Sequence, residues 1–257
     1  MPTTDEAICI ATVDYSETSQ VVNMLTRENG AVRLLAKGSK RPKSKSGGAI
    51  DLFSEGRCVF AGTHRESLGT LMEFAETVSH AALRADLARL NTGLCMLELC
   101  GALLAEQDPA PEVFDLLSRA LVRLAQADAS PPAVLAYFQW RLLRYVGLLG
   151  ELTECVSCGE PFGRGARARR SAFGGAGVYF SSAAGGLLCR NCEPAATEKL
   201  AVAPAALAGI AALAAAEAGK RPKLPDKQAH AVNAVLAYHV EYQIGKRLKT
   251  TRGVIQP

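Results

Sequence analysis

Four cysteines stand in two Cys-x-x-Cys pairs, a spacing typical of metal sites. Within each pair a tight turn lets two thiolates reach one metal ion, and Gly159 eases the first of these turns. Two such turns complete a tetrahedral four-thiolate site, which suits Zn²⁺ and leaves no coordination position open for catalysis. The sequence therefore predicts one structural Zn²⁺ ion with the ligands Cys155, Cys158, Cys189 and Cys192.

The segment between the two pairs has thirty residues, more than the roughly 15–20 of compact zinc sites. It is expected to hold a loop at 164–177 and a small β-hairpin around Val178-Tyr179-Phe180. A redox dithiol is less favoured, because that chemistry needs no second matched pair. The arginines in and around this segment either offset the thiolate charge or extend a basic surface; they are Arg164, Arg167, Arg169, Arg170 and Arg190.

A second cluster has the chemistry to bind an anionic polymer, since five lysine and arginine side chains occur within residues 37–45. Flexible cations on such a loop can follow a phosphate backbone without reading bases. Arg33 on the preceding predicted strand and Arg57 on the next one would place further cations on the same side. A solvated surface loop is the alternative. The side chains predicted to bind a phosphate backbone are Arg33, Lys37, Lys40, Arg41, Lys43, Lys45 and Arg57.

Aromatic side chains are sparse, at 6% of residues, which limits base stacking. Phe53, Phe60 and Phe74 are interpreted as core residues, and Tyr15 is the best candidate for a stacking residue. We therefore expect contacts with a nucleic-acid backbone that are indifferent to base sequence.

Signals for catalysis are absent from the sequence. It contains no phosphate-binding loop, no His-Glu-x-x-His and no Gly-x-Ser-x-Gly. The carboxylate pairs, such as Asp51 and Glu55, are too ordinarily spaced to predict a Mg²⁺ site. We expect a protein that is not an enzyme. The alternatives are a zinc-containing nuclease and a zinc module that binds only other proteins.

The elements that must position these residues change in type near residue 79, where the spacing of hydrophobic residues changes from that of strands to that of helices. Before it, about five short strands with loops between most of them predict a small barrel; residues 21–25 read as a strand or a turn of helix. After it, helices follow, one opened by Asp108-Pro109 and one by Ser130 as N-cap with Pro131 at its first position. Two further helices are expected at 204–218 and 228–248. The predicted class is α+β.

The composition of the 257 residues, with 49% hydrophobic and 21% charged side chains, excludes global disorder. No stretch is apolar enough for a membrane span, and the N-terminus lacks the features of a signal peptide, so we expect a cytoplasmic protein. Residues 81–154 carry nine acidic and six basic side chains, which favours protein contacts there. The basic C-terminus is the better place for an acidic peptide, with the candidate residues Lys246, Arg247 and Lys249.

Several stretches together resemble the RecO family of bacterial DNA repair and recombination mediator proteins. The most specific is the series Leu-Thr-Arg-Glu-Asn-Gly at 25–30 followed by Leu-Ala-Lys-Gly-Ser-Lys-Arg at 35–41. Further matches are Tyr-Ser-Glu-Thr-Ser at 15–19, the run 138–147 leading to the first cysteine pair, and Gly-Lys-Arg-Leu-Lys at 245–249. The chain departs from the family's Lys-Ser-Arg ending by reading Lys-Thr-Thr-Arg at 249–252.

The resemblance implies an OB-fold barrel at 1–80, a helical domain at 81–153, a four-cysteine zinc-finger insert at 154–194, and C-terminal helices at 195–257 that pack on the helical domain. It implies binding to single- and double-stranded DNA and annealing of complementary strands. It also implies partnership with RecR and with the C-terminal tail of single-stranded DNA-binding protein, so that RecA is loaded onto single strands. A cytoplasmic, nucleoid-associated location fits this role.

Overall fold

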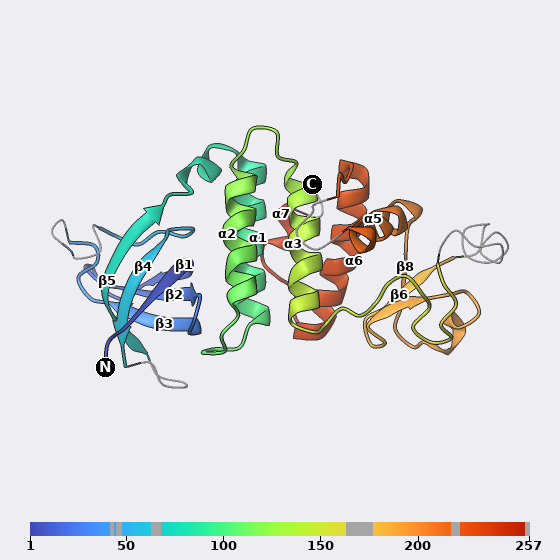
Figure 1. Cartoon of the computed structure of the whole chain (residues 1–257), viewed down its shortest axis with the longest axis horizontal. Helices are drawn as coiled ribbons and strands as arrows, with labels where there is room; N and C mark the ends of the chain where they lie inside the picture. Colours follow the sequence, from blue (N-terminus) through green and yellow to red (C-terminus); the bar gives the residue numbers. More distant parts are fainter. Residues whose placement is uncertain (42–43, 45–47, 63–67, 163–176, 217–221, 255–257) are drawn as a thin grey trace. The chain divides into compact units, whose positions relative to one another are not determined.

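The computed structural model describes residues 1–41, 44, 48–62, 68–162, 177–216 and 222–254 (Figure 1). Contacts divide the chain into two compact units, Met1–Ala129 and Ser130–Pro257. This boundary falls inside the helical domain expected at 81–153, and the four expected domains stay a prediction. Within the described residues, no helix is long and apolar enough to cross a membrane.

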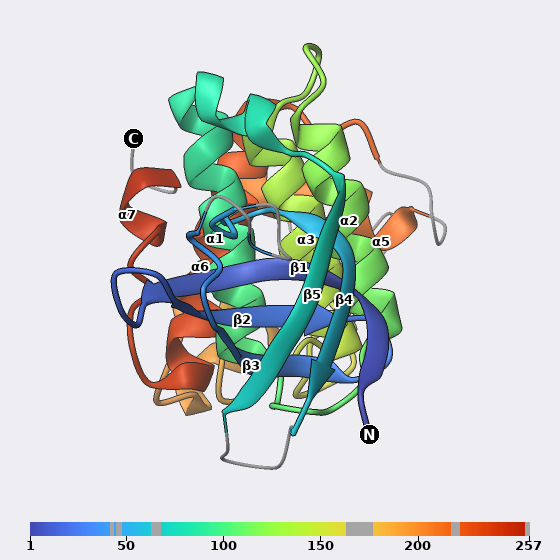
Figure 2. The ribbon, with the colours of Figure 1, turned by 90° about the vertical axis from the view of Figure 1, so that its left-hand side faces the viewer.

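The first unit begins with a closed barrel of five strands. Around the barrel the strands follow the order β1-β2-β3-β5-β4, and Figure 2 shows β4 and β5 crossing β1, β2 and β3. All pairs are antiparallel except β3 with β5. The predicted α+β fold with an N-terminal five-stranded OB-fold barrel is confirmed. The strands are β1 (Thr3–Asp14), β2 (Gln20–Thr26), β3 (Gly30–Ala36), β4 (Glu55–Ala61) and β5 (Gly69–Val78).

Alternation along each strand separates the barrel core from its surface. In β3, Val32, Leu34 and Ala36 are buried, and Arg33 between them is exposed. The stretch 21–25, which the sequence left open, lies within β2 because its alternate residues Val22 and Met24 enter the same core. The outward positions therefore carry the side chains that a ligand can reach.

Two helices follow the barrel in this unit, α1 (Leu87–Leu103) and α2 (Pro111–Leu124), after the short η1 (Ala81–Ala85). The sequence placed the start of α2 at Asp108-Pro109, but the helix begins at Pro111. The reason is a contact with the barrel: Glu106 forms a β-bridge with Ala31, and the N–H of Gln107 donates to the carbonyl of Ala31 at 2.9 Å, so this part of the chain lies beside β3 before the helix starts.

The turn between β2 and β3 packs against this connection. Gly30 has a φ of +66°, and an added Cβ would lie less than 3.0 Å from the backbone N, C and O atoms of Asp108. Nearby, Arg27 forms an ion pair with Asp115 of α2, and its guanidinium lies 5.4 Å from the centre of the Phe114 ring. The β2–β3 turn and the connection before α2 therefore meet with no room for a side chain at position 30.

The second unit combines helices with a small sheet of order β7-β6-β8. The predicted N-cap is confirmed: the Ser130 hydroxyl accepts a hydrogen bond from the N–H of Ala133 at 3.3 Å. The predicted hairpin is present as β6 and β7. The last long helix ends at Ile244 rather than at 248, because Gly245 after it has a φ of +67°. The elements are α3 (Pro131–Tyr145), β6 (Tyr179–Ser181), β7 (Gly186–Leu188), η2 (Glu193–Ala195), β8 (Leu200–Ala201), α5 (Pro204–Ala215), α6 (Asp226–Ile244) and α7 (Thr251–Val254).

A buried histidine lies where α6 meets the sheet of the second unit. The Nε2 atom of His239 lies 2.7 Å from the carbonyl oxygen of Leu148, and its ring packs edge-on against Phe180 with 5.1 Å between ring centres. Burial lowers the pKa of His239 below its usual value. The neutral ring is therefore the form that the folded chain favours.

We expect the stability of this unit to fall as the pH falls through about 6.5, the usual pKa of histidine. Below that pH the unfolded chain binds a proton that folded His239 resists, so the free energy of unfolding decreases until the pH reaches the lower, folded pKa. Above about 6.5 the full stability is retained.

Trp140, the single tryptophan, is buried in α3 and reports unfolding by fluorescence. In the variant His239→Gln, the glutamine amide can still donate to the Leu148 carbonyl but does not titrate. Unfolding of this variant should therefore lose the pH dependence. An unchanged pH dependence would contradict the assignment to His239.

Candidate metal centre and nucleic-acid interface

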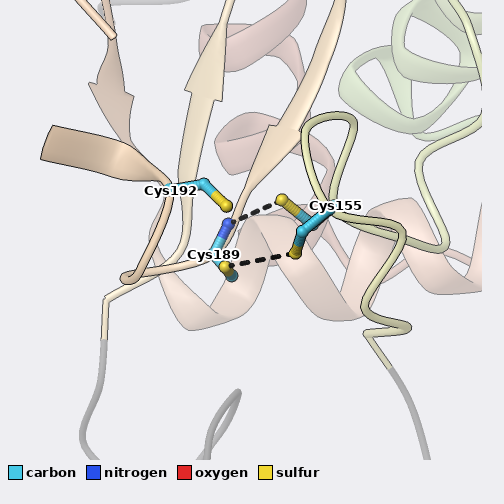
Figure 3. A group of neighbouring side chains, drawn as sticks. Cys155, Cys189 and Cys192 are labelled. Carbon is cyan, nitrogen blue, oxygen red and sulfur yellow. Dashed lines mark hydrogen bonds between the residues drawn. The ribbon is translucent and has the colours of Figure 1, made fainter. Parts of the chain in front are cut away.

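The four cysteines predicted as metal ligands meet at one point of the second unit. Their sulfur atoms all lie within 4.8 Å of one another, and the Sγ atoms of Cys158 and Cys189 are 3.8 Å apart. Figure 3 shows Cys155, Cys189 and Cys192 converging from two turns. Four sulfurs around Zn²⁺, each about 2.3 Å from the ion, would stand about 3.8 Å from each other. The donor set and its spacing therefore fit a metal ion.

Each Cys-x-x-Cys pair is held by backbone hydrogen bonds. The N–H of Gly159 donates to the carbonyl of Cys155 at 2.8 Å, and Gly159 has a φ of +71°, as its predicted role in the turn requires. In the second pair the N–H of Cys192 donates to the carbonyl of Cys189 at 3.1 Å. The hairpin aligns the two turns, because the N–H of Val156 donates to the carbonyl of Leu187 in β7 at 2.8 Å.

The surroundings of two of the cluster's thiols shift their pKa values in opposite directions. Burial raises the pKa of Cys155, but backbone N–H donors, that of Cys189 first, outweigh it and lower the pKa to about 7. A backbone N–H at Glu160 lowers the pKa of Cys158, but the neighbouring thiols of Cys155 and Cys192 raise it to about 12. A divalent cation bound between the four sulfurs would stabilise all of them as thiolates.

Four further cysteines lie outside the cluster. All four are buried, and burial raises the pKa of three of their thiols to about 12. These three thiols, those of Cys9, Cys58 and Cys100, are unreactive near neutral pH. The fourth buried cysteine is Cys95. The predicted loop at 164–177 lies outside the described residues except for Gly177, as do the arginines at 164, 167, 169 and 170.

Part of the predicted DNA-binding set gathers at one edge of the barrel. A surface hollow of about 470 Å³ opens where β1 ends and β3 ends, and it is lined by Tyr15, Thr18, Ser19, Leu35, Lys37, Gly38 and Arg41. Tyr15 is 65% exposed, whereas the phenylalanines at 53, 60 and 74 are buried, in agreement with the sequence interpretation. This hollow brings two cations and one exposed aromatic ring together.

A buried glutamine holds the basic segment in place. Gln20, at the start of β2, is 5% exposed. Its Oε1 atom accepts hydrogen bonds from the Ser39 hydroxyl and the Ile50 N–H, both at 3.0 Å. The N–H of Gly38 donates to the Ser19 hydroxyl at 3.1 Å. Sequence reasoning missed Gln20; the signal was a polar residue in the inward series with Val22 and Met24.

Arg33 and Arg57, two further predicted cations, lie elsewhere on the barrel. Arg33 lines a hollow of about 290 Å³ with Asn23 and Glu106. Arg57 lines a third hollow together with the acidic residues Asp5, Glu6, Glu28 and Glu55. These hollows share no lining residue with the one at Lys37, so the structure does not bring Arg33 and Arg57 to it. Lys43 and Lys45 lie outside the described residues.

The candidate partner site follows the end of α6. Lys246, Arg247 and Lys249 are all exposed. The Arg247 guanidinium also forms an ion pair with Glu241, with 3.4 Å between the charged atoms. An acidic peptide would have to compete with that carboxylate. Its binding here stays a prediction.

A closed OB-fold barrel with a basic hollow, followed by helices and a four-cysteine cluster, defines a class of multidomain proteins built around an oligonucleotide-binding fold. Comparison with known families matches residues 1–79 to "Recombination protein O N terminal" and residues 84–252 to "Recombination protein O C terminal". The chain therefore belongs to the RecO family, whose members are named as DNA repair proteins.

Relatives match over nearly the whole chain. "DNA repair protein RecO" of Myxococcus xanthus (strain DK1622) is 32% identical over 246 residues, covering 96% of this chain and 94% of the relative. The protein of the same name from Anaeromyxobacter sp. (strain K) is 32% identical over 254 residues, covering 95% and 92%. That of Bacillus pumilus (strain SAFR-032) is 29% identical over 201 residues, covering 78% and 72%. The resemblance seen in the sequence is confirmed.

Proposed function

We propose that this chain binds single- and double-stranded DNA without catalysing a reaction, and that it anneals complementary strands during repair. The observation that carries the proposal is the hollow in which Tyr15, Lys37 and Arg41 stand together on the barrel. Cations contact phosphate oxygens, an exposed ring stacks on a base, and neither contact selects a sequence. Neutralising the phosphates reduces repulsion between two strands, while most bases stay free to pair.

All seven predicted cations are proposed to contact DNA. The residues around each described cation indicate how much it is expected to contribute to binding. Lys37 and Arg41 line the hollow with Tyr15, so they are expected to contribute most among the described cations. Arg57 is expected to contribute least, because the carboxylates around it repel phosphate.

The cysteine cluster is proposed to hold one structural Zn²⁺ ion. The ligands would be Cys155, Cys158, Cys189 and Cys192. Bound there, the ion would supply a cross-link between the two turns and no catalytic position.

We further propose that RecR and the acidic tail of single-stranded DNA-binding protein are partners, and that the chain thereby helps to load RecA. The C-terminal cations Lys246, Arg247 and Lys249 would receive the tail. The location would be the cytoplasm, in association with the nucleoid. This part of the proposal rests on the family and on charge.

The test is a double variant, Lys37→Ala with Arg41→Ala, assayed for single-strand binding at several salt concentrations. Losing two phosphate contacts should make the log–log salt slope shallower by about 1.4 and weaken binding about tenfold or more at low salt. The loss should be similar for every base composition, and annealing should fail with it. The single variant Arg57→Ala, which removes a cation from another hollow, is the control and should change both quantities less.

Three outcomes would count against the proposal. An unchanged slope and unchanged annealing in the double variant would mean that the loop is only solvated. Strand cleavage with added Mg²⁺ would favour the nuclease alternative. Failure of the unmodified chain to bind DNA would favour the module that contacts only proteins.

A further inference from the structure

One acidic side chain stands at the edge of the basic hollow. Asp14 is the last residue of β1, directly before Tyr15, and its carboxylate forms an ion pair with the Lys40 ammonium group. The Asp14 side chain is 71% exposed and that of Lys40 is 26% exposed. A cation of the proposed DNA-binding set is thus occupied by the protein's own carboxylate.

The backbone fixes both partners of this pair. Asp14 is paired with Gln20 of β2, and the N–H of Tyr15 donates to the carbonyl of Ser19 at 3.0 Å. The N–H of Lys40 donates to the carbonyl of Thr18 at 3.1 Å. The two side chains therefore start from one hydrogen-bonded frame, and their contact does not depend on a chance meeting of two loose loops.

We propose that Asp14 is an internal competitor for phosphate, which holds Lys40 in the DNA-free protein and must be displaced by the DNA backbone. This inference rests on the proposed function and adds a residue that limits affinity. An exposed ion pair contributes little free energy, so phosphate can displace the carboxylate. Once displaced, Asp14 faces the bound strand and repels it. The result is weaker binding and faster release, which suits a protein that must leave strands after they pair.

The experiment compares Asp14→Asn with Glu17→Gln, measuring affinity and dissociation rate on one single-stranded oligonucleotide at several salt concentrations. Glu17 is an exposed carboxylate in the loop that follows Asp14, so the control removes the same charge three residues away. Asp14→Asn should bind about two- to fivefold tighter at low salt, chiefly through slower dissociation. Its log–log salt slope should steepen by up to about 0.7, since Lys40 would displace one more counterion. Glu17→Gln should change affinity less.

A second pair of variants tests whether Asp14 acts through Lys40. In a Lys40→Ala background, Asp14→Asn should give a clearly smaller gain, because the cation that it holds is gone and only its direct repulsion of the strand is relieved. An equal gain in both backgrounds would mean long-range repulsion only, and would overturn the proposal. So would a gain from Asp14→Asn no larger than that from Glu17→Gln.

The double variant Lys37→Ala with Arg41→Ala separates this failure from failure of the proposed function. If that variant keeps full affinity, the hollow does not bind DNA and the proposed interface is wrong. If it loses affinity while Asp14→Asn gains none, the interface holds and only the role of Asp14 is wrong. Equal thermal midpoints of all variants would exclude a folding defect as the cause.

Discussion

Cys158→Ser is expected to abolish stoichiometric zinc binding and to unfold the region around the cysteine cluster. Cys158 supplies one of four sulfurs that lie within 4.8 Å of one another, and a closed site has no spare ligand to replace it. The strands β6 and β7 have three residues each, too few to fold independently. Structural zinc contributes roughly 10–16 kcal/mol to the folding of such elements, so this loss exceeds that of an ordinary core substitution.

Metal analysis and hydrogen exchange measure this expectation. The unmodified chain, purified without a chelator, should hold one zinc ion, and amide protection in residues 177–201 should be lost with it in the variant. Cys58→Ala removes a buried barrel thiol and is the control, since all four ligands remain. DNA binding by the barrel should survive in both variants. An unmodified chain without zinc, or a Cys158→Ser variant that keeps it fully, would contradict the site.

Gly30→Ala is expected to destabilise the first unit by about 2–5 kcal/mol. Part of this cost is the left-handed backbone, with a φ of +66°, which a residue with a Cβ adopts only with strain. The rest is a collision, because the Cβ would lie less than 3.0 Å from backbone atoms of Asp108, which cannot move aside as a flexible side chain can. Calorimetry should show a thermal midpoint lower by about 10 °C or more.

Gly38→Ala is a matched control for this variant. Gly38 has the same φ of +66°, but its added Cβ would lie 3.5 Å from the Arg41 side chain, an ordinary contact. The control therefore carries the backbone strain without the collision and should cost about 1 kcal/mol. Equal losses in the two variants would show that the approach of Asp108 to Gly30 has no energetic consequence.

The features that the sequence predicted well are local in the chain. A Cys-x-x-Cys turn and the N-cap at Ser130 need only a few neighbouring residues, and both are present as expected. Alternation of apolar residues located the strands, although residues 21–25 became a strand only through burial in the barrel core.

The features that it missed depend on residues far apart in the chain. The strand order pairs Glu6 of β1 with Arg57 of β4, which places Arg57 among carboxylates that no local pattern connects with it. The ion pair of Asp14 with Lys40 arises in the same way, because the end of β1 lies beside the segment that follows β3. Charge counting along the chain therefore identified the basic segment but not which of its cations already has a partner.

The parallel pairing of β3 with β5 governs how the barrel emerges during synthesis. Leu34 pairs with Gly69, so β3 keeps a free edge until the ribosome has released the last strand of the barrel. The first half of β1 likewise waits for β4. A nascent chain of which only the residues before β4 have emerged from the ribosome would expose a three-stranded sheet with two open edges, an arrangement that can pair with another chain. Emergence of the chain through Val78 is what closes both edges.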